Sequence, residues 1–316
     1  MWGQNLARNL AELDALTAVA DHDAKAAKKF ASDFNVPALA VEALINDENI
    51  NGIVIATSAP SHKGLAIKVL EAGKHLHVEK PLALSLAGAI AINVAAKKTN
   101  KQVMVGHLIR YHAAFIELQK QLKSGTIGAL RHIRANRLAL GRIRTTESVL
   151  FDLCPHDLSL ILALADDTPS AVHCFGASYI TPGVVDYLSS FLGFKSGVSA
   201  SMQTSWLSPV KEHRLTVTGS TGALVFDDTK PWSEKLILFQ NRMSLNGENY
   251  VIDEKSPITI PVIETEPLKD EMKAFIKSCD IESPAPTDID EGLAVQKVLE
   301  KMQSSLVDTS SLIFNS

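Results

Sequence analysis

Apolar side chains in the first third of the chain alternate between two spacings. Residues 2–13 and 24–34 carry them at helical spacing, whereas 16–20 and 52–57 are short apolar runs typical of buried strands. Further helices are expected over 41–46, 62–72 and 82–98, and further strands over 74–78 and 102–107. Short strands separated by helices are typical of a parallel, doubly wound sheet. We therefore predict a Rossmann-like domain over residues 1–107.

The pattern changes to period two beyond residue 125. Strands are expected over 171–179, 187–194, 198–206, 214–218, 223–228 and 236–239, followed by a loop and edge segment over 241–262. Helices are expected over 113–122, 267–279 and 289–303. We predict an α+β domain over residues 108–316 with a large, mostly antiparallel sheet. A sheet this broad has an open face, which we expect to be covered by other parts of the protein or by another molecule.

Composition narrows the class of protein. The 316 residues are 46% hydrophobic and 21% charged, as in ordinary globular proteins, and the net charge of −4 argues against nucleic acid as a partner. No apolar run is long enough to span a bilayer, and the start lacks the features of a signal peptide, so we expect a cytoplasmic protein. Cys154, Cys174 and Cys279 lack metal-type spacing, which predicts free thiols and no metal site.

Lys80 lies at the end of the apolar run 74–78, within Glu79-Lys80-Pro81. A lysine at the carboxyl edge of such a strand points into the crevice where α/β sheets bind ligands. Pro81 biases Lys80 towards extended geometry, which specifies the direction of the lysine. Lys80 therefore suits a cationic donor to a substrate oxygen. Alternatively, Glu79 and Lys80 form a solvated charge pair before a turn.

The position of Asp21 suggests that the protein binds a dinucleotide cofactor. It follows the apolar run 16–20 and lies 18 positions after Gly3. In dinucleotide-binding folds an acid about 20 residues beyond the glycine fingerprint binds the adenine ribose. With Asp23 close by and no arginine beside them, these carboxylates favour NAD over NADP. Alternatively, Asp21 opens a turn and caps the helix over 24–34.

The amino end of the fold is incomplete. Gly3 corresponds to only the last glycine of G-x-G-x-x-G, and neither the other two glycines nor the first strand precedes it. Without that strand the sheet would lack its middle and the turn that admits the pyrophosphate. Either the functional protein begins upstream of residue 1, or this chain is impaired in binding its cofactor.

Four motifs in order give the chain a family resemblance. Ala56-Thr57 with Pro60 and His62 resembles the A-T-P-x-x-x-H cofactor loop of the Gfo/Idh/MocA oxidoreductases, and Glu79-Lys80-Pro81 matches their signature tripeptide. Residues 105–111 and 152–157 are similar to the segment that enters the second domain and to the D-x-x-x-H-D catalytic element. The resemblance implies a sugar or inositol dehydrogenase. It also implies that the cofactor contacts Gly3, Asp21, Thr57, His62, Glu79, Lys80 and Arg110.

The catalytic residues implied by this resemblance are Lys80, Asp152 and His156, which would meet at the nicotinamide. His156 is the candidate base, since it falls in the first turn of a helix that Pro155 opens, where the helix dipole disfavours the imidazolium. Asp152 would orient the ring or hold the sugar, and Lys80 would polarise the reacting oxygen. Alternatively, His156 makes a structural hydrogen bond at a helix end.

Residues 136–144 and the form Pro-His-Asp look most like the nucleotide-sugar 3-dehydrogenases of surface-polysaccharide or lipid A synthesis. These enzymes oxidise the 3-hydroxyl of UDP-N-acetylglucosamine or its uronic acid. Arg137, Arg142 and Arg144 would then pair with a diphosphate or uronate, unless they only form a wet sheet face. A simple-sugar or inositol dehydrogenase and a non-catalytic NAD-binding regulator are the alternatives. The family resemblance also implies a homo-oligomer, a dimer or a tetramer.

Overall fold

The computed structural model describes residues 2–141, 143–145, 147–240 and 242–309, and it divides the chain into two compact units. Met1–Tyr111 and Glu266–Gln296 form the first unit, and His112–Thr265 with Lys297–Ser316 forms the second. The expected division after residue 107 did not include the return of Glu266–Gln296 to the first unit. The reason lies in packing, because helix α9 (Pro267–Ile281) buries Leu268 and Met272 against α1 (Trp2–Glu12).

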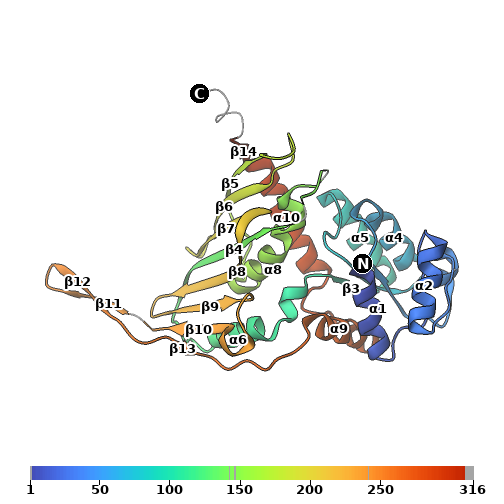
Figure 1. Ribbon diagram of the computed structural model, residues 1–316, viewed down its shortest axis with the longest axis horizontal. Helices are drawn as coiled ribbons and strands as arrows, with labels where there is room; N and C mark the ends of the chain where they lie inside the picture. Colours follow the sequence, from blue (N-terminus) through green and yellow to red (C-terminus); the bar gives the residue numbers. More distant parts are fainter. Residues whose placement is uncertain (1, 142, 146, 241, 310–316) are drawn as a thin grey trace. The chain divides into compact units, whose positions relative to one another are not determined.

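The first unit is built on a three-stranded parallel sheet in the order β1 (Gly52–Ile55), β2 (His75–Val78) and β3 (Val103–Val105). Helices α4 (Ala59–Glu71) and α5 (Leu86–Thr99) connect the strands (Figure 1). Ile53 and Ile55 pack in a core with α4 and α5, whereas Val54 contacts the cluster formed by α1 and α9. Both faces of the sheet are therefore covered, which explains its continuous apolar strands.

The expected strand over 16–20 is reduced to a single parallel bridge between Val19 and Ala38. The N–H of Val19 donates to Pro37 at 3.0 Å, and the N–H of Leu39 donates to Val19 at 2.9 Å. Helices α2 (Ala24–Phe34) and α3 (Val41–Asn46) flank this bridge and have the predicted bounds. Among the described residues, the backbone of this segment is thus paired on the side of residues 37–39.

The second unit holds a nine-stranded sheet in the order β13-β10-β9-β8-β4-β7-β6-β5-β14. Its strands are β4 (Leu130–Leu140), β5 (Ala171–Ala177), β6 (Tyr187–Gly193), β7 (Ser199–Ser205), β8 (Leu207–Gly219), β9 (Ala223–Asp227), β10 (Leu236–Phe239), β13 (Ile258–Thr259) and β14 (Leu306–Asp308). Neighbours are antiparallel except in the pairs β4–β7 and β5–β14. The predicted large, mostly antiparallel sheet is thus confirmed.

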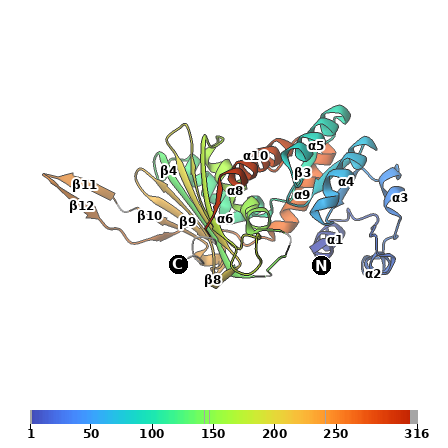
Figure 2. The ribbon, with the colours of Figure 1, turned by 90° about the horizontal axis from the view of Figure 1, so that it is seen from above.

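Helices cover one face of this sheet. They are α6 (Ala113–Lys123), α7 (Val149–Asp152) and α8 (Cys154–Ala165), and Figure 2 shows α6 and α8 beside the strands. Helix α10 (Ile289–Ser305) belongs to the first unit up to Gln296 and to the second unit beyond it. Part of the region expected to be a loop is instead a hairpin of β11 (Arg242–Asn246) and β12 (Asn249–Asp253). Short 3-10 turns, η1 (Leu108–Tyr111) and η2 (Trp232–Glu234), complete the elements.

Among the helices of the described residues, none combines the length and the apolar character needed to cross a membrane.

Candidate active site

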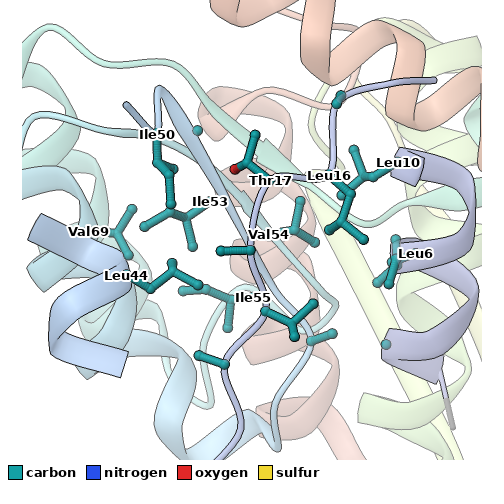
Figure 3. A pocket seen from close by; sticks show the side chains of 18 of the residues that line it. Leu6, Leu10, Leu16, Thr17, Leu44, Ile50, Ile53, Val54, Ile55 and Val69 are labelled. Atoms are coloured by element: carbon teal, nitrogen blue, oxygen red, sulfur yellow. The ribbon is translucent and has the colours of Figure 1, made fainter. Parts of the chain in front are cut away.

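A cavity of about 410 Å³ lies in the first unit, between β1 and residues 15–21. Three residues that the sequence assigned to the cofactor, Gly3, Asp21 and Thr57, line it together. Elsewhere the lining is mainly aliphatic, as Figure 3 shows for the side chains around β1. The cavity is within the size range of ligand pockets. Asp21 and Asp280 are the acids in this lining, and the side chain of Asp21 is 33% exposed.

Two roles were predicted for Asp21, binding of the adenine ribose and capping of α2, and the structure gives the capping role to Asp23. Asp23 is the N-cap of α2 and accepts from the N–H of Lys25 at 2.8 Å. The Oδ1 atom of Asp21 accepts from the N–H of Asp23 at 2.9 Å and lies 2.9 Å from Nδ1 of His22. Capping of α2 is therefore done by Asp23, which leaves the carboxylate of Asp21 able to accept hydrogen bonds from a ribose.

His62 connects the loops that follow β1 and β2. It is buried, with Nε2 at 3.0 Å from the carbonyl oxygen of Thr57 and Nδ1 at 2.8 Å from that of Pro81. A neutral imidazole donates from only one nitrogen, so it satisfies one of these carbonyls at a time. His62 thus positions the cofactor loop and the loop of Lys80 through their backbones.

Glu79 points into the unit, whereas Lys80 is half-buried at the end of β2. The Oε1 atom of Glu79 accepts from Nε1 of Trp2 at 2.6 Å, and burial raises the pKa of this carboxyl. A Cβ on Gly106 would lie 2.9 Å from a carboxylate oxygen of Glu79, so the absence of a side chain at Gly106 leaves room for this carboxylate. Within the signature tripeptide, Glu79 therefore anchors the loop.

Arg110 belongs to an ion-pair group that joins η1 to the start of α10. Its Nη1 atom is 3.7 Å from Oε1 of Glu291, and Nδ1 of His107 is 2.7 Å from Oε2 of the same carboxylate. Burial lowers the pKa of Arg110, and Glu291 opposes that change. Sequence reasoning missed Glu291, because no local pattern connects it with a segment so far away in the chain.

Asp152 is the focus of the site in the second unit. It ends α7, is buried, and accepts from Nη2 of Arg144 at 2.9 Å and from Nε1 of Trp206 at 3.1 Å. Helix α8 begins at Cys154 with Pro155 in its first turn, which places His156 in that turn as predicted. The α7–α8 junction therefore brings a carboxylate held by two donors close in sequence to a half-buried imidazole. Trp206 was not anticipated, since an indole 54 residues away gives no local signal.

Arg137 was expected to pair with a diphosphate or uronate, but the structure places it in a buried ion pair. Its Nε and Nη2 atoms donate to the two carboxylate oxygens of Asp157 at 2.9 and 2.8 Å, and both side chains are buried. Because this guanidinium already makes a bidentate pair inside the unit, it is not placed to bind a diphosphate or uronate. The alternative, a wet sheet face, does not describe Arg137 either, because this side chain is buried. Arg142 lies outside the described residues.

Cys154 lies inside the catalytic motif, but its thiol is not reactive. It is buried, its Sγ is 3.6 Å from Oγ1 of Thr204, and burial raises its pKa to about 12. A thiol with so high a pKa is not a nucleophile at neutral pH. Within the described part of the chain, no three His, Cys, Asp or Glu side chains are grouped so that they could hold a metal ion.

A parallel sheet with an acid beside β1, followed in the second unit by a mixed sheet and an Asp-His helix junction, defines a two-unit α/β protein whose first unit is Rossmann-like. The chain matches "Oxidoreductase family, NAD-binding Rossmann fold" over residues 2–107 and "GFO/IDH/MocA C-terminal domain" over residues 115–225. It belongs to the Gfo/Idh/MocA oxidoreductase family, as the motifs predicted.

Several curated relatives share part of the sequence. The UDP-N-acetylglucosamine 3-dehydrogenase of Acidithiobacillus ferrooxidans is 28% identical over 64% of this chain and 63% of its own length. The inositol 2-dehydrogenase of Acidothermus cellulolyticus is 32% identical over 48% of this chain and 46% of its own length. The myo-inositol 2-dehydrogenase of Thermotoga maritima is 24% identical over 83% and 81%. The chain thus spans less than two thirds of the first two relatives.

The fold is shared more widely than the sequence. The solved UDP-N-acetylglucosamine 3-dehydrogenase of A. ferrooxidans has a TM-score of 0.84 with 22% identity, and the match covers 97% of this chain and 94% of that one. The structure of a "putative myo-inositol dehydrogenase" from Sinorhizobium meliloti has a TM-score of 0.80 at 22% identity, and the match covers 96% of this chain and 93% of that one. The fold class predicted from the sequence is therefore confirmed.

Proposed function

We propose that the chain is an NAD-dependent dehydrogenase that removes a hydride from a secondary hydroxyl of a sugar, at C3 of a UDP-N-acetylhexosamine or its uronate. The observation that carries the proposal is the junction of α7 and α8, where Asp152 is held by Arg144 and Trp206 beside His156. The choice of sugar is supported by the similarity to the UDP-N-acetylglucosamine 3-dehydrogenase.

Asp21 and Thr57 fit the ribose side of NAD. Asp21 presents a carboxylate at the cavity beside β1, where it would accept from ribose hydroxyls and repel a 2′-phosphate. The nicotinamide of NAD supplies the hydride acceptor when it is bound. His62 contacts the backbone carbonyls of Thr57 and Pro81, so it would help to hold the loops that carry Thr57 and Lys80 in place.

The chemistry assigns one task to each catalytic side chain. Oxidation of the alcohol also requires removal of a proton from its oxygen, and a neutral His156 is the general base. Lys80 would donate to the same oxygen and stabilise its developing negative charge. Asp152, fixed by Trp206, would orient the His156 ring or a sugar hydroxyl.

Arg144 is the side chain we assign to the acidic part of the substrate. Its side chain is 41% exposed, and besides Asp152 it contacts Glu147 at 3.4 Å. A guanidinium at such a half-open position can turn towards phosphate or uronate oxygens while the indole of Trp206 still holds Asp152.

Incubation of the chain with NAD and UDP-N-acetylglucosamine or its uronate, followed by absorbance of NADH, tests the proposal. His156→Asn should lower kcat by about 10²–10⁴-fold, since a general base contributes that much. His173→Asn is the matched control, because His173 is exposed on β5. Unchanged turnover in His156→Asn would remove His156 as the base. Absence of NADH formation with every sugar tested, despite measured NAD binding, would favour the non-catalytic regulator.

An inositol or simple-sugar dehydrogenase is the second candidate, because two inositol dehydrogenases are similar to this chain. UDP alone distinguishes the candidates. It should compete with a nucleotide-sugar substrate for a shared diphosphate site, whereas oxidation of myo-inositol should be insensitive to it.

A further inference from the structure

Both partners of the hydrogen bond between Trp206 and Asp152 are held by the same two consecutive residues. The carbonyl oxygen of Val185 accepts from the N–H of Val149 at 3.0 Å. Val149 begins α7, the helix that ends at Asp152. The carbonyl oxygen of Asp186 accepts from the backbone N–H of Trp206 at 3.2 Å. The position of the indole relative to the carboxylate of Asp152 therefore depends on where these two residues lie.

The backbone of Trp206 is fixed at both its N–H and its carbonyl. Its pairing with Asp186 continues the antiparallel register of β6 and β7 by one step beyond the last pair of these strands (Figure 1). The hydroxyl of Ser205 donates to the same carbonyl of Asp186 at 2.8 Å, and the N–H of Gly141 donates to the carbonyl of Trp206 at 2.9 Å. With its main chain held in this way, the indole has little freedom to move from its acceptor.

The side chain of Asp186 fixes this segment in turn. Its Oδ2 atom accepts from the N–H of Tyr179 at 2.9 Å and from the N–H of Ile180 at 2.8 Å. The N–H of Asp186 donates to the carbonyl of Ala177 at 3.0 Å. The residue is 1% exposed, and its Oδ1 atom has no hydrogen-bond partner among the described residues. One carboxylate oxygen thus ties the end of the connection between β5 and β6 to its beginning.

The negative charge of Asp186 is the feature that an amide at this position would lack. A buried polar atom without a partner destabilises a fold, and such atoms are rare in folded proteins. Hydrogen bonds to an ionised acceptor are about twice as strong as those to a neutral one. The carboxylate therefore holds the N–H groups of Tyr179 and Ile180 more firmly than an amide oxygen would, and the rigidity of the segment depends on it.

We propose that Asp186 is a positioning residue of the active site, which holds the indole N–H of Trp206 on the carboxylate of Asp152. Asp186 acts through the backbone and needs no contact with substrate or cofactor. Without its charge, the segment loosens and the indole N–H leaves Asp152 more often, so this carboxylate is less able to orient the His156 ring or a sugar hydroxyl. The link to turnover rests on the dehydrogenase function proposed above.

The first measurement follows the indole N–H of Trp206 in the full chain by heteronuclear NMR. Its resonance is assigned by its loss in Trp206→Phe. In Asp186→Asn we expect this N–H to exchange with water at least about tenfold faster, because the segment opens more often. Asp227→Asn is the matched control and should leave the exchange unchanged. Asp227 is also buried and accepts from a backbone N–H, that of Thr229 at 3.0 Å.

The second measurement is a double-mutant cycle on turnover with NAD and the sugar that the chain oxidises. Asp186→Asn should lower kcat about tenfold and leave KM within about threefold, since residues in one hydrogen-bond network are energetically coupled. In a Trp206→Phe background the same change should lower kcat less than about twofold, because the indole N–H through which Asp186 acts is gone. Asp227→Asn should turn over like the unchanged chain.

Unaltered indole exchange in a folded Asp186→Asn variant would overturn the proposal. So would equal losses of kcat in the two backgrounds, which would separate Asp186 from Trp206, or the same changes in Asp227→Asn. If circular dichroism shows that Asp186→Asn does not fold, Ser205→Ala decides instead, because it removes the hydroxyl that donates to the carbonyl of Asp186. Unaltered indole exchange in that variant would overturn the proposal too.

Failure of the dehydrogenase proposal gives a different result. The unchanged chain would then form no NADH with any sugar, while the indole exchange rate of Trp206 would still respond, or fail to respond, to Asp186→Asn. The NMR measurement therefore decides the role of Asp186 by itself.

Discussion

Side chains of one type have different tasks in this protein because their surroundings differ. Arg137 and Arg144 are seven positions apart, yet one is buried in a bidentate pair with Asp157 and the other is half-exposed beside Asp152. His156 in the first turn of α8 was predictable, since a proline near a helix start is a local signal. Trp206 as a donor to Asp152 was not, since the contact depends on how β7 passes α7.

Trp206→Phe should slow turnover more than it weakens substrate binding. The change replaces the indole with a smaller aromatic ring and removes the N–H that holds Asp152, and a hydrogen bond to a charged group contributes about 1.5–3 kcal/mol. We expect kcat to fall about 10–100-fold, with KM within a few-fold and a shifted pH profile. Trp232→Phe in η2 is the matched control. Equal loss in both variants would mean that Trp206 has only a packing role.

His213 should make the second unit less stable in mild acid. Burial lowers its pKa to about 4, with Arg137 adding to the effect. The unfolded chain binds a proton near pH 6.5 and the folded chain only near pH 4, so stability falls as pH decreases across that window. The charged groups that act on this ring are Arg137, Lys211, Asp157 and Asp228.

Urea unfolding at pH 7 and pH 5 measures this effect. His213→Gln should lose less stability between the two pH values than the unchanged chain, whereas His173→Gln, at an exposed position of β5, should behave like the unchanged chain. The same acid sensitivity in His213→Gln would show that other groups cause it.

Predicted helices and strands are present where the local sequence pattern favours them and where, for strands, a distant segment supplies a neighbour. Helix α2 has the predicted bounds because both of its ends carry local signals, the Asp23 cap and the left-handed Asn35. The run 16–20 has the composition of a strand but makes one bridge, because strands need a neighbour that a single segment cannot supply. Strand β4 and helix α8 are joined by a contact that neither pattern indicated.

Removal of one partner of the ion pair between Arg137 on β4 and Asp157 on α8 should strongly destabilise the fold. Arg137→Met leaves a buried carboxylate without its partner, so we expect the free energy of unfolding to fall by about 3–5 kcal/mol. Arg137→Met combined with Asp157→Leu removes both charges and should restore much of that loss. Chemical denaturation of the three proteins measures it, and a double variant that is less stable than the single one would contradict the explanation.

The nine-stranded sheet leaves large apolar side chains on its outer face. Phe175 on β5 and Phe191 on β6 are 55% and 47% exposed, and the register places Phe191 opposite His173, two residues from Phe175. Exposed aromatic side chains on a broad sheet mark an interaction surface. This supports the homo-oligomer inferred from the family resemblance.

Self-association should therefore depend on this face. We expect the unchanged chain to sediment as a dimer or tetramer and a Phe175→Asp, Phe191→Asp variant to sediment as a smaller species, because buried carboxylates oppose association. Val94→Asp, at an exposed position of α5, is the control. A monomeric unchanged chain in analytical ultracentrifugation would end the oligomer proposal.

Local and near-local signals were enough to predict the order of elements, the two kinds of sheet, Lys80 at a strand end and His156 in a helix turn. These depend on the backbone propensities and the spacing of residues that are close in the chain. Other features depend on segments far apart: the return of residues 266–296 to the first unit, the burial of Arg137 with Asp157, the Trp206 contact with Asp152, and the cavity beside β1. A contact between distant segments is determined by which apolar faces pack together, and no short stretch of sequence records that choice.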